Sequence, residues 1–203
     1  MSTVTEDCGL RERKKRETRS AIHRAALDLV EEKGYAAVTT DAIAARAGVS
    51  ARTFFNYYPS KDAAVLGTRP EDLDQVAARI ETQPADETPL DCLRVAILDL
   101  LAPSTLDRAL RAQRRRVLLG EPALAPAMIG NNIRVENALT AALERRLGVA
   151  PGAALEPRLT VAASLAAVRA CIEHHHGSSG GRDGRDLNAS IERAFDLLAA
   201  GLR

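Results

Sequence analysis

In the N-terminal third of the chain, several side chains that recognise nucleic acid occur together at helical spacing. Arg52 can donate a fork of hydrogen bonds to guanine or bind a phosphate, and Asn56 can pair with adenine. Thr53 can contact a thymine methyl or a backbone oxygen, whereas the Tyr57 hydroxyl and the Lys61 ammonium suit phosphates. A helix of about seven residues is roughly 10 Å long, close to the major-groove width of about 12 Å. The pattern therefore predicts a short helix that reads the major groove of DNA.

Two short helices joined by a tight turn would position these side chains. Thr39 can cap the first helix, and Ser50 can cap the second. Gly48 lies between them and tolerates the positive φ that a sharp helix stop demands. Phe54 and Tyr58 are four residues apart, so we expect both to pack inward. The apolar face of the first helix is formed by Ile43, Ala44 and Ala47. The segment thus predicts a helix-turn-helix.

A basic segment precedes this hairpin. Residues 11–24 carry seven Arg or Lys side chains against two Glu, and residues 8–61 have a net charge of +5 in a chain whose total is +1. Such a patch attracts a phosphate backbone whatever the base sequence, although it is also compatible with a merely solvated helix face. The side chains expected to contact DNA are Arg13, Lys14 and Arg16. An amphipathic helix is predicted over residues 18–33, with His23 exposed or near a phosphate.

These residues resemble the TetR family of bacterial transcriptional regulators over about residues 12–67. The shared pattern is Gly34, Tyr35, Thr39, Ile43-Ala44, Ala47-Gly48-Val49-Ser50, Thr53-Phe54-Phe55 and Ser60-Lys61-Asp62. The resemblance implies an all-α fold with an N-terminal three-helix helix-turn-helix DNA-binding domain and its basic arm at residues 1–67. It also implies a C-terminal helical effector-binding and dimerisation domain at residues 68–203. The candidate DNA-binding residues are Thr39, Thr40, Ser50, Arg52, Thr53, Asn56, Tyr57 and Lys61.

The chain departs from the family pattern at two positions. Phe55 stands where many members have tyrosine, so a hydroxyl contact to phosphate is missing there. Tyr58 replaces the usual core phenylalanine, so its hydroxyl needs a partner or must reach solvent.

Composition agrees with a helical protein large enough for a substantial core. No segment of the 203 residues approaches the 18 or so apolar residues that cross a bilayer. No apolar stretch follows the N-terminal basic run, so we expect a cytoplasmic protein without a secretory signal. Cys8, Cys92 and Cys171 are far apart and include no C-x-x-C pair, which favours reduced thiols. A redox pair of Cys92 and Cys171 stays open.

Beyond residue 67, hydrophobic periodicity predicts further amphipathic helices. Their expected ranges are 70–82, 90–101, 104–119, 125–147, 156–176 and 186–202. On the last two helices, small or apolar side chains form stripes that allow close helix approach. The stripes are Leu159, Ala162, Ala163, Ala166, Ala170 and Cys171, and Ile191, Ala194, Phe195, Leu198 and Leu202. Both could form an intramolecular core, but the TetR resemblance implies a homodimer and a roughly palindromic operator.

The resemblance also implies a small-molecule effector in the second domain. The arginine tract that begins at Arg114, with the Gly-Glu-Pro that follows it, looks similar to a TetR subgroup that includes mycofactocin-system regulators. That subgroup suggests an acyl-coenzyme A or another apolar ligand, with arginines at its phosphates. The candidate ligand-binding residues are Arg114, Arg115, Met128 and Asn132. Surface salt bridges for the arginines and solvent exposure for Asn132 are open alternatives.

Signatures of catalysis are missing from the sequence, which has no G-x-G-x-x-G, G-x-S-x-G or H-E-x-x-H motif. His174, His175 and His176 are consecutive, so in a helix they point about 100° apart, and we expect neither a metal site nor a cofactor. The resemblance implies a ligand-responsive regulator of transcription that is not an enzyme and that binds double-stranded operator DNA. Because most members of the family are repressors, it also implies a repressor. The alternative is a helical protein-interaction module of the same fold that has lost specific DNA binding.

Overall fold

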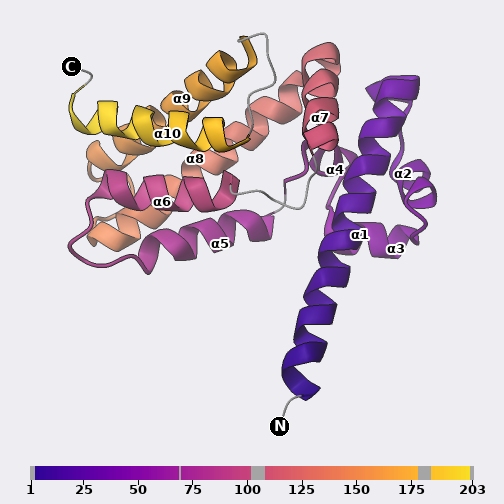
Figure 1. Cartoon of the computed structure of the whole chain (residues 1–203), viewed down its shortest axis with the longest axis horizontal. Coiled ribbons are helices and arrows are strands. Elements are labelled where there is room, and N and C mark those ends of the chain that lie inside the picture. The colour runs from indigo at the N-terminus through magenta and orange to yellow at the C-terminus, as the bar shows by residue number, and fades with distance from the viewer. Residues whose placement is uncertain (1–2, 69, 102–107, 178–183, 202–203) are drawn as a thin grey trace. The chain divides into compact units, whose positions relative to one another are not determined.

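The computed structural model describes residues 3–68, 70–101, 108–177 and 184–201, and every regular element in these ranges is helical (Figure 1). The expected all-α class is therefore confirmed. The chain divides into two compact units, one of residues 1–69 with 105–130 and one of residues 70–104 with 131–203. No helix of the described ranges combines the length and the apolar character that crossing a membrane requires.

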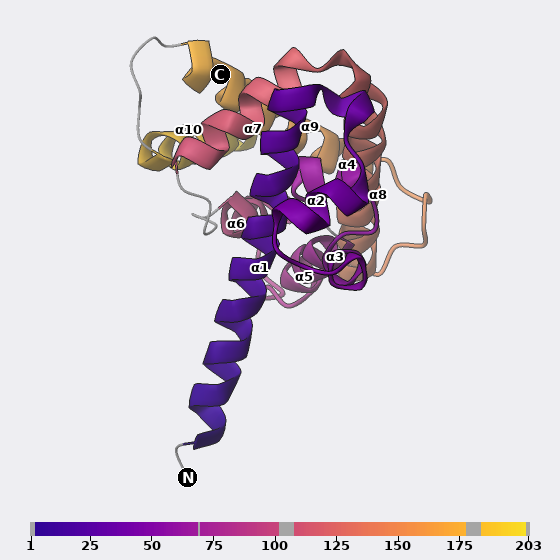
Figure 2. The same cartoon turned by 90° about the vertical axis from the view of Figure 1, so that its right-hand side faces the viewer.

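The first unit is built around one long helix. Its elements are α1 (Thr3–Lys33), the short 3₁₀ helix η1 (Tyr35–Ala37), α2 (Thr40–Arg46), α3 (Ala51–Tyr57), α4 (Lys61–Leu66), α7 (Arg108–Gly120), η2 (Pro122–Leu124) and the start of α8 (Ala125–Leu147). Helix α1 begins well before the predicted residue 18, and Figure 2 shows its first turns extending away from α2–α4. The added turns contain Arg, Lys and Glu, which are good helix formers, and Arg13 and Glu17 pair across one turn at 3.4 Å.

The caps predicted for α2 and α3 are confirmed. The Thr39 hydroxyl accepts a hydrogen bond from the Ala42 N–H at 3.2 Å, and the Ser50 hydroxyl accepts one from the Thr53 N–H at 3.0 Å. Gly48 has the expected positive φ of 68°. The core beneath these helices contains Ile22, Ala26, Leu29, Ile43, Ala44, Phe54 and Tyr58. These side chains hold α2 and α3 against α1, so the turn geometry and the buried face agree.

Helix α7 also belongs to the first unit by its contacts. Leu110 and Val117 are part of the same core, and the Gln113 amide donates to the Asp28 carboxylate at 2.7 Å. The first segment of this unit ends at residue 69, close to the domain boundary expected after residue 67. Nothing in the sequence pattern indicated that α7 would join the N-terminal helices, because its hydrophobic period is compatible with either core.

The second unit consists of α5 (Pro70–Glu81), α6 (Pro89–Leu101), residues 131–147 of α8, α9 (Glu156–Gly177) and α10 (Gly184–Ala199). Helices α9 and α10 pack side by side (Figure 1). Cys92 and Cys171 are free, buried thiols of this core, and burial raises the pKa of both. Leu202, part of the predicted stripe, and residues 104–107 of the helix predicted over residues 104–119 lie outside the described residues.

The expectation that His23 is exposed is wrong. Only 2% of its surface is accessible, and its Nδ1 forms a hydrogen bond with the Ala64 carbonyl oxygen at 2.7 Å. Two arginines donate to the carbonyls that follow, Arg19 to Gly67 and Arg114 to Leu66, each at 3.0 Å. Polar groups from α1 and α7 thus satisfy the last carbonyls of α4, which have no partner within the helix. His23 is buried by contact with a helix 41 positions away, which the helical period of its own segment does not indicate.

Replacing Gly67 with alanine should destabilise the first unit strongly. Gly67 has φ +71°, and a Cβ there would lie 3.0 Å from the His23 Cε1. Strain of about 1–2 kcal/mol for the positive φ therefore adds to about 1–3 kcal/mol for the steric conflict. The free energy of unfolding from urea titration measures the loss. Gly48→Ala is the matched control, because φ there is +68° but no atom lies within 4 Å of the added Cβ. Equal losses in both variants would contradict this account.

The unfolding free energy should also fall between pH 7 and pH 4 because of His23. Burial, with Arg114, Arg19 and Arg24 nearby, lowers the pKa of His23 from 6.5 to about 4, although its bond to Ala64 opposes the shift. The neutral imidazole is favoured in the folded state, so its contribution is complete above pH 6.5 and is lost as the pH falls towards 4. The loss amounts to about 3 kcal/mol by proton linkage. A His23→Gln variant should lack this part of the pH dependence, and identical pH profiles for the two proteins would refute it.

Candidate nucleic-acid interface

Helix α3 presents one polar face to solvent. Arg52, Asn56, Ala51 and Phe55 are exposed, whereas Phe54 on the opposite side is fully buried. These exposed positions are spaced i, i+1, i+4 and i+5, so they form a continuous strip along the helix. Arg52 and Asn56, the two side chains predicted to read base edges, lie together on this strip.

Thr53 and Tyr57 flank the strip and are half-buried. The Thr53 hydroxyl lies 2.9 Å from the Ser50 hydroxyl, so part of its hydrogen-bonding capacity is used in the helix cap. Tyr57 packs partly against the core of the first unit. Both side chains therefore sit at the edge of the exposed face, a place better suited to a phosphate than to the centre of a groove.

Phe55 is an exposed aromatic side chain on the same face, outside the set of polar residues predicted to contact DNA. Its side chain is 54% exposed, and its ring meets the Phe54 ring edge to face with centroids 5.3 Å apart. An exposed ring between Arg52 and Asn56 can make apolar contact with a thymine methyl. The signal was present in the sequence, since Phe55 is three residues after Arg52 and shares its face of the helix.

Helix α2 packs against α3. Thr39 is exposed and Thr40 half-buried, and both stand at the N-terminal end of α2. Ser50 is exposed at the start of α3. Hydroxyls and backbone N–H groups at helix starts commonly bind phosphates.

Lys61 is tied to its own protein more tightly than the sequence suggested. Its ammonium donates to the Tyr35 and Val38 carbonyls at 3.1 and 3.0 Å and lies 4.2 Å from the centroid of the Tyr35 ring. An ammonium has three N–H donors, so these bonds leave one for a phosphate.

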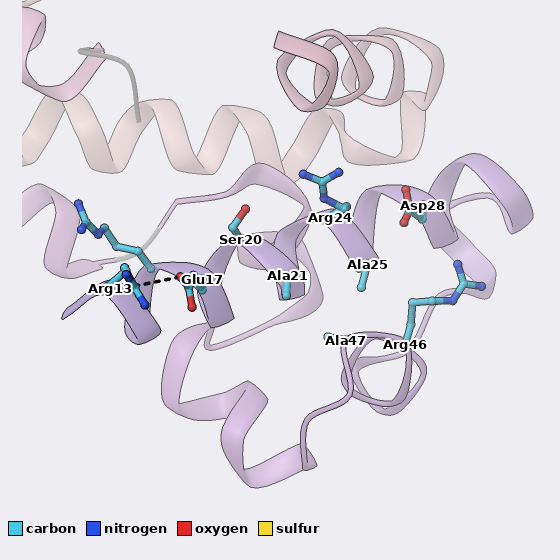
Figure 3. Close-up of a pocket in the computed structure, with 10 residues that line it drawn as sticks. Arg13, Glu17, Ser20, Ala21, Arg24, Ala25, Asp28, Arg46 and Ala47 are labelled. Carbon is cyan, nitrogen blue, oxygen red and sulfur yellow. Dashed lines mark ion pairs between the residues drawn. The ribbon is translucent and has the colours of Figure 1, made fainter. Parts of the chain in front are cut away.

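A groove of about 570 Å³ lined by several charged side chains runs between α1 and the end of α2 (Figure 3). Its lining residues are Arg13, Arg16, Glu17, Ser20, Ala21, Arg24, Ala25, Asp28, Arg46 and Ala47. Part of its charge is paired internally: Arg13 with Glu17, and Arg46 with Glu32 through two bonds of 2.9 and 2.8 Å. The Arg46 bonds lower the pKa of Glu32. Lys14 and Arg16 are exposed on α1, as a role in phosphate attraction requires.

The four candidate ligand-binding residues do not share one environment. The guanidinium of Arg114 donates to the Leu66 carbonyl, Arg115 is exposed, and Met128 packs on the core of the first unit. Asn132 is exposed and belongs to the second unit. The contact of Arg114 favours a structural role over ligand binding. Among the residues that the structure describes, no cluster of His, Cys, Asp and Glu could hold a metal ion, and the His175 and His176 side chains lie outside that set.

Two family models match the chain. Residues 22–66 match the model described as bacterial regulatory proteins, tetR family, and residues 87–203 match the MftR C-terminal domain. The first match contains α2, α3 and α4, and the second contains α6 to α10.

Curated relatives and a solved structure extend this similarity over more than nine-tenths of the chain. The chain is 29% identical to the HTH-type transcriptional regulator TcmR of Streptomyces glaucescens, over 94% of this chain and 86% of TcmR. It is 25% identical to a Mycobacterium tuberculosis protein named as the mycofactocin biosynthesis regulator MftR, over 94% and 93%. FadR of Thermus thermophilus, a TetR-family repressor solved with lauroyl-CoA, has the same fold at a TM-score of 0.50 and 24% identity, over 91% and 95%.

Proposed function

Since the chain belongs to the TetR family of bacterial transcriptional regulators, we propose that it binds a roughly palindromic operator as a dimer and represses transcription until an effector binds. Proteins of this family bind operator DNA, dimerise and bind small-molecule effectors. The observation that carries the proposal is the exposed face of α3, on which Arg52 and Asn56 lie together. A protein that acts on DNA in this way works in the cytoplasm of a bacterium.

Each candidate residue has a distinct part in this proposal. Arg52 and Asn56 contact base edges in the major groove, and Thr53 contacts a base or backbone at its margin. The groups that bind phosphates around the groove are Thr39, Thr40, Ser50, Tyr57 and Lys61. Their positions at helix starts and at the edge of the α3 face support this division.

The dimer is proposed to form through α9 and α10. Leu159 is 59% exposed, and Ala166 and Ala170 are exposed on the same side of α9 at spacings of seven and four residues. On α10, Ile191 and Phe195 are instead buried in the core of their own unit. The exposed part of the α9 stripe, at Leu159, Ala166 and Ala170, is thus open to a second copy, which could approach closely, whereas Cys171 packs in the core of its own unit. In a twofold dimer the reading helices would enter major grooves one turn, about 34 Å, apart.

The proposed effector class is an acyl-coenzyme A or a similar apolar ligand. FadR of Thermus thermophilus carries lauroyl-CoA in the same fold, and the subgroup resemblance points the same way. Of the arginine tract, Arg115 is the better candidate for a phosphate, because Arg114 bonds to Leu66 and Arg116 pairs with Glu31 at 3.0 Å. The ligand needs only to bind the DNA-incompetent dimer about 1–3 kcal/mol better, which weakens operator binding roughly 5- to 150-fold.

Selection of bound fragments from random DNA tests the function. The full-length protein should enrich an inverted repeat, and a mobility shift with that duplex should respond to acyl-coenzyme A. Enrichment of no sequence, with salt-sensitive binding to any duplex, would favour the alternative of an interaction module without specific DNA binding. A selected operator that no acyl-coenzyme A releases at a saturating dose would reject this effector class and leave the regulator assignment intact.

A further inference from the structure

Glu121 makes an unusual contact with the DNA-binding helices. Its Oε2 accepts a hydrogen bond from the Tyr35 backbone N–H at 2.8 Å, although the two residues are 86 positions apart. Tyr35 directly follows Gly34, where φ is 75° and α1 has ended. The Tyr35 N–H therefore has no partner within α1. A carboxylate acceptor makes this bond charge-assisted, and such bonds are shorter and stronger than neutral ones.

Tyr35 in turn holds the start of α4. Its carbonyl accepts from the Lys61 ammonium at 3.1 Å, and its ring lies under the same ammonium. Its hydroxyl bonds to the Asp62 carboxylate. Burial and this neighbouring carboxylate raise the pKa of Tyr35, so the phenol stays protonated as a donor. Both of the first two side chains of α4 thus depend on the position of Tyr35.

Lys61 connects this cluster to α2. Its second hydrogen bond goes to the Val38 carbonyl at 3.0 Å, and the Val38 side chain is buried in the core. The next residue, Thr39, caps α2. A chain of contacts therefore runs from Glu121 through Tyr35 and Lys61 to the start of α2, within the first unit.

We propose that Glu121 is a positioning residue for operator binding, whose carboxylate fixes Tyr35 and thereby the Lys61 ammonium and the N-terminus of α2. This inference rests on the proposed contact between Lys61 and a phosphate. Glu121 does not touch DNA itself. The proposal predicts that removal of the Glu121 carboxylate weakens DNA binding. Charge alone predicts the opposite, because removal of a negative charge from a DNA-binding protein should strengthen its attraction to phosphates.

The test measures the dissociation constant of the full-length protein for its selected operator over a series of salt concentrations. Glu121→Ala should weaken binding about tenfold, and the slope of log affinity against log salt should fall by about one per lost phosphate contact, or two per dimer. Glu121→Gln keeps an acceptor and should stay within about threefold of the original protein. Glu121→Asp keeps the charge but is one methylene shorter, so it should resemble Glu121→Ala.

A double-mutant cycle with Lys61→Ala decides whether the two residues act together. If Glu121 works through Lys61, the double variant should bind no more weakly than Lys61→Ala alone. Gln113→Ala is the matched control. Like Glu121, Gln113 bonds to a residue more than 80 positions away in the same unit, but its partners are Asp28 and Glu31 of α1 rather than Tyr35. This control should leave the salt slope unchanged.

Four outcomes would overturn the inference. Additive losses of affinity in the double variant would show that Glu121 does not act through Lys61, and so would tighter binding by Glu121→Ala. Either result would leave the proposed contact between Lys61 and a phosphate intact. An unchanged salt slope in Lys61→Ala would reject the phosphate contact and the inference together, whereas the wider regulator assignment would still depend on α3. If Glu121→Ala fails to fold, the operator affinities of folded Glu121→Asp and Glu121→Gln are compared instead. Equal affinities for these two variants would overturn the inference.

Discussion

Replacing Arg52 with alanine is expected to weaken operator binding by at least about 30-fold. Arg52 is exposed on α3, so its loss should leave the buried core of the first unit intact. A bidentate contact with a base is worth about 1–3 kcal/mol, and a twofold dimer loses two of them, or about 2–6 kcal/mol. The dissociation constant for the selected operator measures the effect. Adding Asn56→Ala should deepen the loss, because that residue reads a different base.

The Arg52 result needs a control for charge alone. Arg115→Ala removes an exposed arginine from the same unit but not from the reading face, so it should alter binding only slightly. Repeating the selection with Arg52→Ala should show relaxed preference at one position of each half-site. A uniform loss for every duplex would assign Arg52 to phosphate rather than to a base. Undiminished operator binding would remove the main support for the proposed reading face.

Replacing Ala166 with arginine is expected to convert the dimer to a monomer and to lower operator affinity by about 10²–10⁴-fold. Ala166 is exposed in the middle of the α9 stripe, so a single chain can accommodate the longer side chain in solvent. In a close-packed interface the same side chain would introduce a buried charge and steric conflict on both sides of the twofold axis. A monomer has only one α3 helix to bind the operator, so it loses the gain in affinity that comes from binding both half-sites at once. That gain accounts for the expected 10²–10⁴-fold loss. Light scattering at micromolar concentration gives the oligomeric state.

The matched control for Ala166 is Ala78→Arg. Ala78 is an exposed alanine of α5, outside the proposed dimer face. The control should remain dimeric, bind the operator normally and keep the unfolding free energy of the original protein. Ala166→Arg should lose only the part of that free energy that subunit association supplies. A dimeric Ala166→Arg protein would place the interface elsewhere. A monomeric protein that still binds the operator at full affinity would contradict the two-headed geometry.

The helix-turn-helix could be predicted in detail because its determinants are local. Thr39 and Ser50 cap helices through N–H groups three residues ahead, and Gly48 takes the positive φ that the turn requires. Such contacts depend on spacing along the chain, which sequence displays directly. Phe54 and Tyr58 were correctly assigned to the core for the same reason, since the helical period separates buried from exposed faces.

The errors and omissions concern residues whose partners are distant in sequence. His23 was expected at the surface but is buried against Ala64, 41 positions away. Nor did the sequence indicate that the guanidinium of Arg114, a candidate ligand-binding residue, would bond to the Leu66 carbonyl, 48 positions away. Phe55 is different, because helical spacing alone places it beside Arg52. It was absent from the predicted contacts because these included only polar side chains.

The sequence alone therefore determined the family, the all-helical class and the helix-turn-helix, because capping, turn and amphipathic signals act within a few residues. Only the tertiary structure decided that α7 joins the N-terminal helices, that α4 ends among His23, Arg19 and Arg114, and that Glu121 reaches Tyr35. Those contacts join side chains and backbone groups that are 41 to 86 positions apart. Their existence depends on how helices pack, and a single sequence carries no period or spacing that specifies it.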